Sequence, residues 1–144
     1  MKTFSLEEAQ TLVPVLESLM KNAMEAKKTA ETISEEMQHL SQRIFMNGGT
    51  LVHIAAVAKR RAQQDKAVQQ VKDTMAEIDS IGVQVKDLDT GLLDFPCRLG
   101  DEIVLLCWKM GETEIRHWHT MDSGFSGRRA VDERFRRPQK PKPN

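Results

Sequence analysis

Two runs of apolar residues, spaced by three and four, constrain the fold of this chain more than any other feature of its sequence. The first run follows Ser5 and Glu8, a pair whose spacing is that of a capping box at the start of a helix. Because Pro14 lacks the N–H that a helix interior uses, we expect a short capping helix that bends there into a main helix from about Val13 to Phe45. The apolar positions of this run are Leu12, Leu16, Met20, Ala23, Ala26, Ala30, Ile33, Met37, Leu40 and Ile44.

The second run follows residues 47–50, where two glycines tolerate positive φ and a threonine hydroxyl can cap the next helix. We expect the chain to reverse there and a second helix to extend from Leu51 to roughly Ser80. Its spacing predicts an antiparallel, coiled-coil-like helical hairpin over residues 5–80. The apolar positions of this run are Ile54, Ala55, Ala58, Ala62, Val68, Val71, Met75 and Ile78.

Charges and small residues predict the pairing of the two helices near the middle of the second one. Folding the hairpin about Gly48 places the basic segment from Lys59 to Arg61 close to Glu35 and Glu36. Exposed pairs of this kind stabilise helices by only a few tenths of a kcal/mol, so they would set the register more than the stability. Along the line of contact between the two helices, which we call the seam, three alanines are expected to let the helices approach closely: Ala26, Ala30 and Ala62.

After Gly82 the spacing of the apolar residues changes from about 3.6 to two, which is the period of a β-strand. We expect strands at 83–86, 92–97, 103–108 and 114–119, joined by turns at 89–91, 100–101 and 110–113. Three or four of these strands should form an antiparallel meander, with Pro96 at an edge or bulge position. Such a small sheet should pack one face on the helical hairpin.

The predicted fold class is α+β: a long antiparallel helical hairpin, a small antiparallel β-meander and a disordered basic C-terminal tail. A length of 144 residues suits a single domain. Its parts are the hairpin (5–80), the meander (82–121), a Gly/Arg loop and extension (122–137) and the tail (138–144). From Arg128 onward, seven basic residues face two acidic ones, and three prolines with few apolar groups favour disorder at the end.

Composition argues against several kinds of partner. The 21 basic and 21 acidic residues balance, so no field of the whole molecule draws it to nucleic acid or anionic lipid. No stretch approaches the roughly 18 apolar residues of a membrane span, and the N-terminus lacks an apolar signal region, so we expect a cytoplasmic protein without membrane contacts. Nucleic-acid binding through the tail ranks last among the functions considered, because no reading element accompanies its charge.

Reactive side chains gather in the last predicted hairpin. His117 and His119 point to the same face of a strand, and either Cys107 or its neighbour Leu106 shares that face, depending on the register. With Glu112 in the turn, these residues are candidate ligands of a divalent metal: Cys107, Glu112, His117 and His119. The alternative is structural, with the imidazoles bonded to backbone or carboxylates and Cys107 in the core.

A glycine-rich loop follows the hairpin and ends in basic residues. Its backbone amides and Arg128 could hold a phosphate or carboxylate. The structural alternative, in which the arginines pair with Glu112 or Asp122, is favoured because no phosphate-binding motif is present. A nucleophilic pair of Cys107 and His117 is disfavoured, since it needs an activated, exposed thiol. We read Cys97 and Cys107 as reduced thiols.

An ordered series of short motifs spans the second half of the chain: GLLDFP at 91–96, LCWKMGE at 106–112, WH at 118–119 and GFSGR at 124–128. With the two helices before it, this series resembles a small bacterial family of unknown function. The resemblance implies a bacterial cytosolic protein and no particular activity. His117 lies outside the series, which favours a site built on His119 with Glu112 or Asp122. The resemblance marks as motif positions Asp94, Cys107, Trp108, Glu112, His119 and Arg128.

Two functions are therefore predicted. The first is a non-enzymatic, self-associating helical module that forms a homodimer, because helices about 45 Å long exceed what roughly 40 residues of strand and turn can cover. The alternative is a metal- or anion-binding protein, either catalytic or not, with Glu112, His119 and Arg128 converging in one cluster. No cofactor is expected beyond that divalent metal, and the sequence does not identify a small-molecule ligand. The polar binding candidates are Asp94, Glu112, His119, Asp122 and Arg128.

Overall fold

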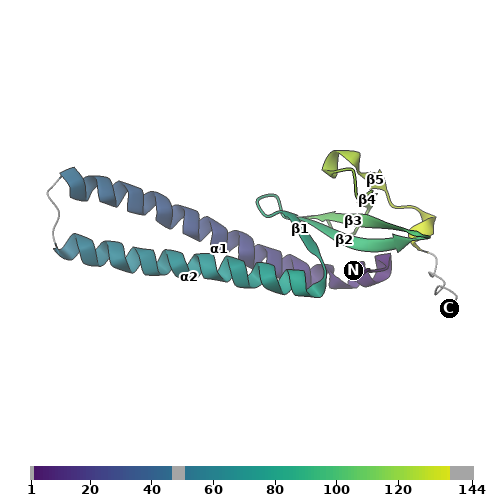
Figure 1. Ribbon diagram of the computed structural model, residues 1–144, viewed down its shortest axis with the longest axis horizontal. Coiled ribbons are helices and arrows are strands. Elements are labelled where there is room, and N and C mark those ends of the chain that lie inside the picture. The colour runs from purple at the N-terminus through teal and green to yellow at the C-terminus, as the bar shows by residue number, and fades with distance from the viewer. Residues whose placement is uncertain (1, 47–50, 137–144) are drawn as a thin grey trace. The chain divides into compact units, whose positions relative to one another are not determined.

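The computed structural model describes residues 2–46 and 51–136, and within them it contains two long helices followed by a five-stranded antiparallel sheet (Figure 1). The helices are α1 (Leu6–Met46) and α2 (Leu51–Ile81). The strands, which neighbour one another in sequence order, are β1 (Gln84–Asp87), β2 (Leu92–Leu99), β3 (Glu102–Lys109), β4 (His117–His119) and β5 (Arg129–Ala130). This is the predicted α+β class, a helical hairpin followed by a meander.

Tertiary contacts divide the chain into two compact units. The sheet unit comprises Met1–Met20 and Ala76–Asn144, and the hairpin unit comprises Lys21–Met75. Neither helix in the described residues has an apolar stretch long enough to cross a membrane. The predicted interhelical turn at 47–50 and the predicted tail at 138–144 lie outside the described residues.

The capping box forms as the sequence predicts, but the bend at Pro14 does not. The Ser5 N–H donates to Oε1 of Glu8, and the Glu8 N–H donates to Oγ of Ser5, at 3.3 and 3.1 Å. From there α1 continues as one helix through Pro14, so the expected separate capping helix is wrong. Pro14 lies on the exposed face while Val13 and Leu16 are buried, so the loss of one backbone hydrogen bond is offset by burial on the other face.

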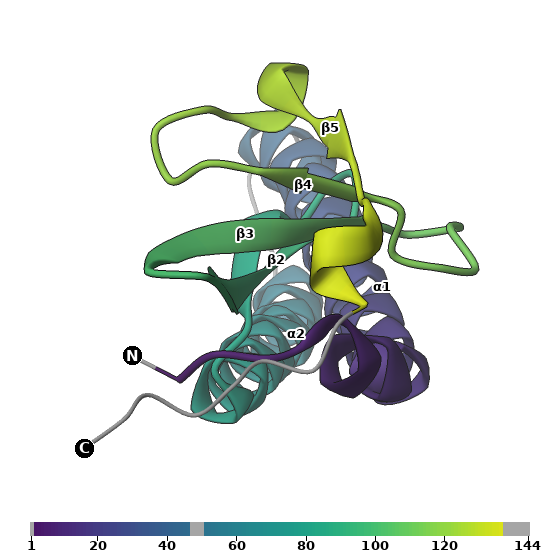
Figure 2. The same ribbon diagram turned by 90° about the vertical axis from the view of Figure 1, so that its right-hand side faces the viewer.

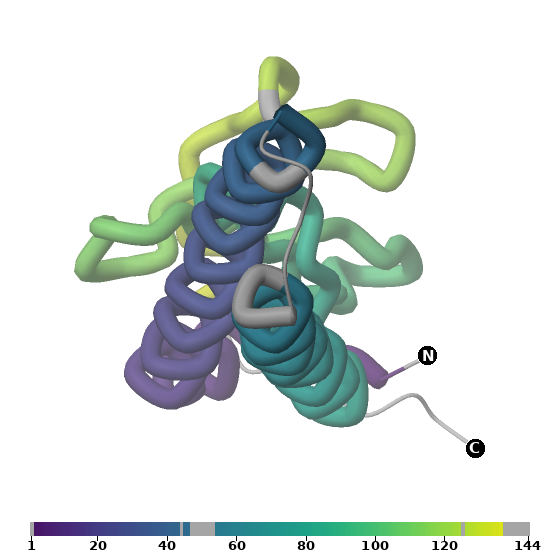
Figure 3. Tube along the Cα trace, turned by 90° about the vertical axis from the view of Figure 1, so that its left-hand side faces the viewer, coloured from purple at the N-terminus to yellow at the C-terminus, as the bar shows by residue number. Residues whose placement is uncertain are grey.

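In the hairpin unit α1 and α2 lie side by side (Figure 3), and Arg60 forms the expected ion pair with Glu36. The buried face of α2, however, differs from the predicted one. Ala67 is buried and Gln64 is half-buried, with its Nε2 donating to the carbonyl of Ala30 at 3.5 Å. The predicted apolar positions of α2 between residues 54 and 68 are exposed instead: Ile54, Ala55, Ala58, Ala62 and Val68.

The rotation of α2 has a physical cause. Ile78 is fully buried, and counting back from it in steps of four and three leads through Thr74, Val71, Ala67 and Gln64 to Arg60. Alanine loses little by exposure, so the three alanines among the exposed positions hold the predicted face only weakly against the burial of Ile78. The seam therefore keeps the predicted Ala26 but not Ala62.

The sheet follows the predicted strands closely at its centre. The β2–β3 hairpin has the expected two-residue turn, in which Gly100 adopts a φ of 64° that favours glycine. Pro96 lies beyond the end of the β1 pairing, where its carbonyl accepts the N–H of Phe4 at 2.7 Å, so this proline occupies an edge position as expected.

The last part of the sheet differs from the prediction in two ways. The expected strand at 114–119 is reduced to His117–His119, because the side chain of Gln10 bonds the backbone before it. Gln10 donates to the Thr113 carbonyl and accepts from the Ile115 N–H, at 3.3 and 2.8 Å. A fifth strand, β5, pairs with β4 and was not predicted, since two residues are too few to show a period of two.

One face of the sheet forms the main core with the first turns of α1 and the last turn of α2 (Figure 2). Trp108 and Phe95 are its largest fully buried side chains. Each large apolar side chain buried there contributes about 1.5–3 kcal/mol. Because side chains alternate along a strand, the residues between these core positions point to the opposite face of the sheet.

Candidate functional site

Polar side chains from three adjacent strands meet on the face of the sheet opposite the main core. Asp94 on β2 is paired with Cys107 on β3, and Cys107 is paired with His117 on β4. His119 follows two residues later, so it shares the same face. This register places Cys107, rather than Leu106, on the face of the two imidazoles, which settles the choice that the sequence left open.

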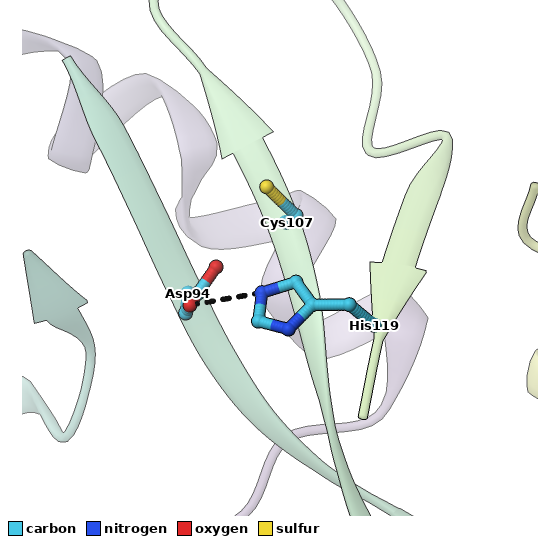
Figure 4. A group of neighbouring side chains, drawn as sticks. All are labelled: Asp94, Cys107 and His119. Carbon is cyan, nitrogen blue, oxygen red and sulfur yellow. Dashed lines mark hydrogen bonds and ion pairs between the residues drawn. The ribbon is translucent and has the colours of Figure 1, made fainter. Parts of the chain in front are cut away.

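Asp94, Cys107 and His119 form a compact buried group, which we call the strand cluster (Figure 4). Their side-chain oxygen, sulfur and nitrogen atoms lie within 4.8 Å of one another. The three residues are 1%, 0% and 4% exposed, respectively. When a carboxylate, a thiol and an imidazole are buried together, each charge needs an opposite charge or a hydrogen bond from another member of the cluster.

The hydrogen bonds of His119 fix its tautomer. Its Nδ1 lies 2.9 Å from the carbonyl oxygen of Thr120, and because a carbonyl can only accept, Nδ1 carries a proton. Its Nε2 lies 3.0 Å from Oδ2 of Asp94. Two lone pairs cannot face each other at that distance, so one further proton is shared between the imidazole and the carboxylate.

The second oxygen of Asp94 is less well satisfied. Oδ1 is buried, and no nitrogen or oxygen donor among the described residues reaches it. The Cys107 thiol is hydrogen-bonded to Asp94, but S–H is a weak donor, and poorly satisfied buried groups in native structures often mark a bound ion or a functional role. Oδ1 is thus an acceptor facing into a closed group of potential ligands.

Cys107 is held as a thiol. Burial, followed by the charge of Asp94, raises its pKa to about 12, although the Arg128 guanidinium acts in the opposite direction. A thiol of this kind is almost fully protonated at neutral pH and is a poor nucleophile. The chemistry therefore disfavours a cysteine nucleophile at this position, in agreement with the expectation from the sequence.

A second polar group, the turn cluster, is built on Glu112 between β3 and β4. Nη2 of Arg128 donates to both of its carboxylate oxygens, at 3.0 and 3.2 Å, and the Lys109 N–H donates to Oε1 at 2.6 Å. The backbone carbonyl of Glu112 accepts from Nε1 of Trp108 at 2.9 Å. Nδ1 of His117 lies 3.8 Å from Oε2. Glu112 thus ties the turn to the core and to the loop that carries Arg128.

The glycine loop delivers Arg128 to this turn. Ser123 accepts the Thr120 N–H at 3.2 Å, which folds the loop back directly after His119. A Cβ added at Gly127 would lie only 2.6 Å from Cβ of Ser123, so this close approach requires glycine.

The predicted site residues therefore separate into two clusters. Glu112 pairs with Arg128, the structural alternative weighed for this loop, while His119 contacts Asp94 rather than Glu112 or Asp122, and Asp122 is exposed. Of the four metal candidates, Cys107 and His119 lie in the strand cluster, and Glu112 and His117 lie in the turn cluster. Asp94 was missing from that set, although a single carboxylate within the apolar strand 92–97 is a signal of buried chemistry.

Residues 2–131 match a protein family described as "Uncharacterized conserved protein (DUF2203)". The match includes both helices, the sheet as far as β5 and every residue of the two polar clusters. No curated protein and no solved structure matches the chain.

Proposed function

The chain belongs to this family of uncharacterized conserved proteins, and we propose that it is a non-enzymatic module that self-associates as a homodimer through an exposed face of α2. The observation that carries the proposal is the exposure of α2 positions whose spacing is that of a helix–helix seam. Ile54 is 61% exposed and Val68 is 38% exposed. Phe45 and Met46, at the end of α1, add further apolar surface at 88% and 82% exposure.

The exposed face of α2 contains a regular stripe. Its members are separated by alternating steps of four and three, which keeps them on one side of a helix, as in a coiled coil. All of them are exposed. The α2 stripe consists of Ile54, Ala58, Arg61, Asp65, Val68 and Lys72.

This stripe is complementary to itself in one orientation. In an antiparallel pair of α2 helices centred on Gln63, Arg61 of one copy faces Asp65 of the other, and this contact occurs twice. The same symmetry sets Ala58 against Val68, and Ile54 against the methylene stem of Lys72. A parallel pair in register would instead oppose Arg61 to Arg61, so charge favours the antiparallel dimer.

Arg61 and Asp65 are available for this contact. They lie four residues apart on one helix, a spacing at which an ion pair within the chain is common. In the described part of the chain, however, neither residue takes part in an ion pair. A partner helix would therefore satisfy charges that face water in the single chain.

A charge swap tests the proposed dimer. Sedimentation of the full chain at micromolar concentration should give twice 16.4 kDa. Arg61→Asp and Asp65→Arg each oppose like charges twice and should weaken the dimer at least tenfold, whereas the double variant should restore it. Lys66→Asp, a charge reversal on an exposed position outside the stripe, is the matched control and should leave the dimer intact. A monomeric wild type, or single variants that dimerise as well as the wild type, would contradict the proposal.

Ligand binding on the sheet is the second candidate function, and the buried Oδ1 of Asp94 favours it. The sequence centres this function on Glu112, His119 and Arg128, of which Glu112 and Arg128 already bond each other. A ligand would accordingly be held by the strand cluster. Melting temperatures recorded with zinc and with phosphate, added separately, distinguish a metal site from an anion site, and no shift with either would remove this candidate.

A further inference from the structure

We propose that Asp94, Cys107 and His119 bind one divalent transition-metal ion, with zinc as the best fit. The inference rests on the second candidate function and names its ligand class. A carboxylate, a thiolate and an imidazole are three of the ligand types that proteins use for zinc, and a thiolate excludes magnesium and calcium as preferred ions.

The spacing of the three ligands suits such an ion. Zinc lies about 2.0–2.3 Å from oxygen, nitrogen and sulfur ligands, which places tetrahedral ligands roughly 3.3–3.8 Å from one another. The ligand atoms of the strand cluster are all within 4.8 Å. Rotations about side-chain torsions can supply the movement of roughly 1–1.5 Å that closes this difference.

His119 is already oriented as a ligand. Its Nδ1–H is held by the Thr120 carbonyl at 2.9 Å, which leaves Nε2 as the coordinating atom. This outer bond to a backbone carbonyl is the arrangement that orients metal-binding histidines and sets their tautomer. Nε2 points at Asp94, whose Oδ1 has no nitrogen or oxygen donor among the described residues.

Charge balance inside the sheet also favours a divalent ion. Without metal, the strand cluster holds one proton between His119 and Asp94 and a second proton on Cys107. Entry of a divalent cation displaces both protons, so the net charge of the buried cluster does not change. Metal bound to a thiol displaces its proton even where burial opposes ionisation.

Three protein ligands leave one coordination position for water or another small molecule. Closed structural zinc sites have four protein ligands, whereas sites with three are those at which a bound water or substrate exchanges. The charges of Glu112 and Arg128, in the turn cluster, both act on Cys107. The proposed ion is therefore of the exchangeable kind.

Metal loading of the purified full chain tests the inference directly. After treatment with a chelator and dialysis against zinc, we expect one zinc per chain and the release of about two protons per zinc in weak buffer. Cobalt in place of zinc should give the charge-transfer absorption of a thiolate–cobalt bond. The displaced protons come from the strand cluster.

Two cysteines provide a matched pair of variants. Cys107→Ser should abolish the cobalt charge-transfer band and weaken zinc binding at least tenfold. Cys97→Ser removes an equally buried thiol that points to the main core, and it should leave the band and the stoichiometry unchanged. The wild-type spectrum gives an answer even if a variant fails to fold.

Each outcome bears on the inference. A wild type that binds no zinc, or a thiolate band that survives Cys107→Ser and vanishes in Cys97→Ser, overturns it. A melting shift with phosphate and none with zinc would overturn the metal while leaving a ligand site on the sheet. If neither zinc nor phosphate shifts the melting temperature, both the metal and the ligand site on the sheet are contradicted. The test of the dimer is independent of these results.

Discussion

The sheet unit and the hairpin unit bury their side chains in different ways. In the sheet unit, Trp108 and Phe95 are fully enclosed, and even the opposite face of the sheet holds a buried polar cluster. The seam of the hairpin unit is built on small residues such as Ala26 and Ala67, crossed by the Arg60–Glu36 ion pair. Ile33 is buried in this unit, but Ile54, Phe45 and Met46 are exposed on its outside.

This difference indicates which unit can bury further apolar surface by binding a partner. The sheet unit buries most of its large apolar side chains, with Val15 and Met121 as exposed exceptions, and the strand cluster is itself buried. The hairpin unit leaves apolar surface in water, and a second copy could bury it. The proposed metal site and the proposed dimer interface therefore lie in separate units of one chain.

The largest expected effect comes from the core of the sheet unit. Trp108→Ala should lower the free energy of unfolding by about 3–5 kcal/mol, because it empties a large volume and removes the bond to the Glu112 carbonyl. Ile33→Ala, at a buried position of the hairpin unit, should be less destabilising, about 2–3 kcal/mol. Urea unfolding measures the free energy of unfolding of both variants. A less stable Ile33 variant would contradict the comparison between the two units.

A smaller effect is expected at the turn of the sheet unit. Glu112→Gln weakens the pair with Arg128 and should lower the free energy of unfolding by about 1–2 kcal/mol, since both side chains are mostly buried and the amide still accepts one hydrogen bond. Glu114→Gln, at an exposed position nearby, is the control and should change stability by less than about 0.5 kcal/mol. Equal or higher stability of the Glu112 variant would point instead to a strained functional residue.

In the hairpin unit, a polar change on the stripe should separate folding from association. Val68→Asp should alter the stability of the isolated chain by less than about 0.5 kcal/mol, because the side chain is exposed. Its dimer should nevertheless be at least tenfold weaker, which sedimentation over a range of concentrations can measure. A large drop in helicity by circular dichroism would show that Val68 contributes to the fold itself and not only to a dimer.

No effect on folding is expected from the end of the chain. Deletion of residues 138–144 should leave the melting temperature unchanged, because a charged, proline-rich segment buries little apolar surface. Calorimetry of the shortened protein checks this, and a drop of several degrees would mean that the segment is docked.

Features set by neighbouring residues were predictable from the sequence. The capping box of Ser5 and Glu8, the two-residue turn at Gly100 and the ends of α2 all depend on short-range patterns, and all were predicted. The Arg60–Glu36 pair followed from folding two helices about one turn.

Features set by contacts distant in sequence were not predictable in the same way. Asp94 and His119 lie 25 residues apart and meet across the intervening strand β3, so their bond depends on a strand register that the sequence left open. Gln10 ends a predicted strand from more than a hundred residues away. The buried face of α2 was mistaken because alanines carry too weak a hydrophobic signal to set the rotation of a helix.

Native mass spectrometry of the zinc-treated protein tests the separation of the two units most directly, because one spectrum reports both chain number and bound metal. The wild type should appear as two chains of 16.4 kDa with two zinc ions. Arg61→Asp should appear as one chain with one zinc, and Cys107→Ser as two chains with none. Loss of metal and of the dimer together in either variant, or a metal-free monomeric wild type, would contradict the account.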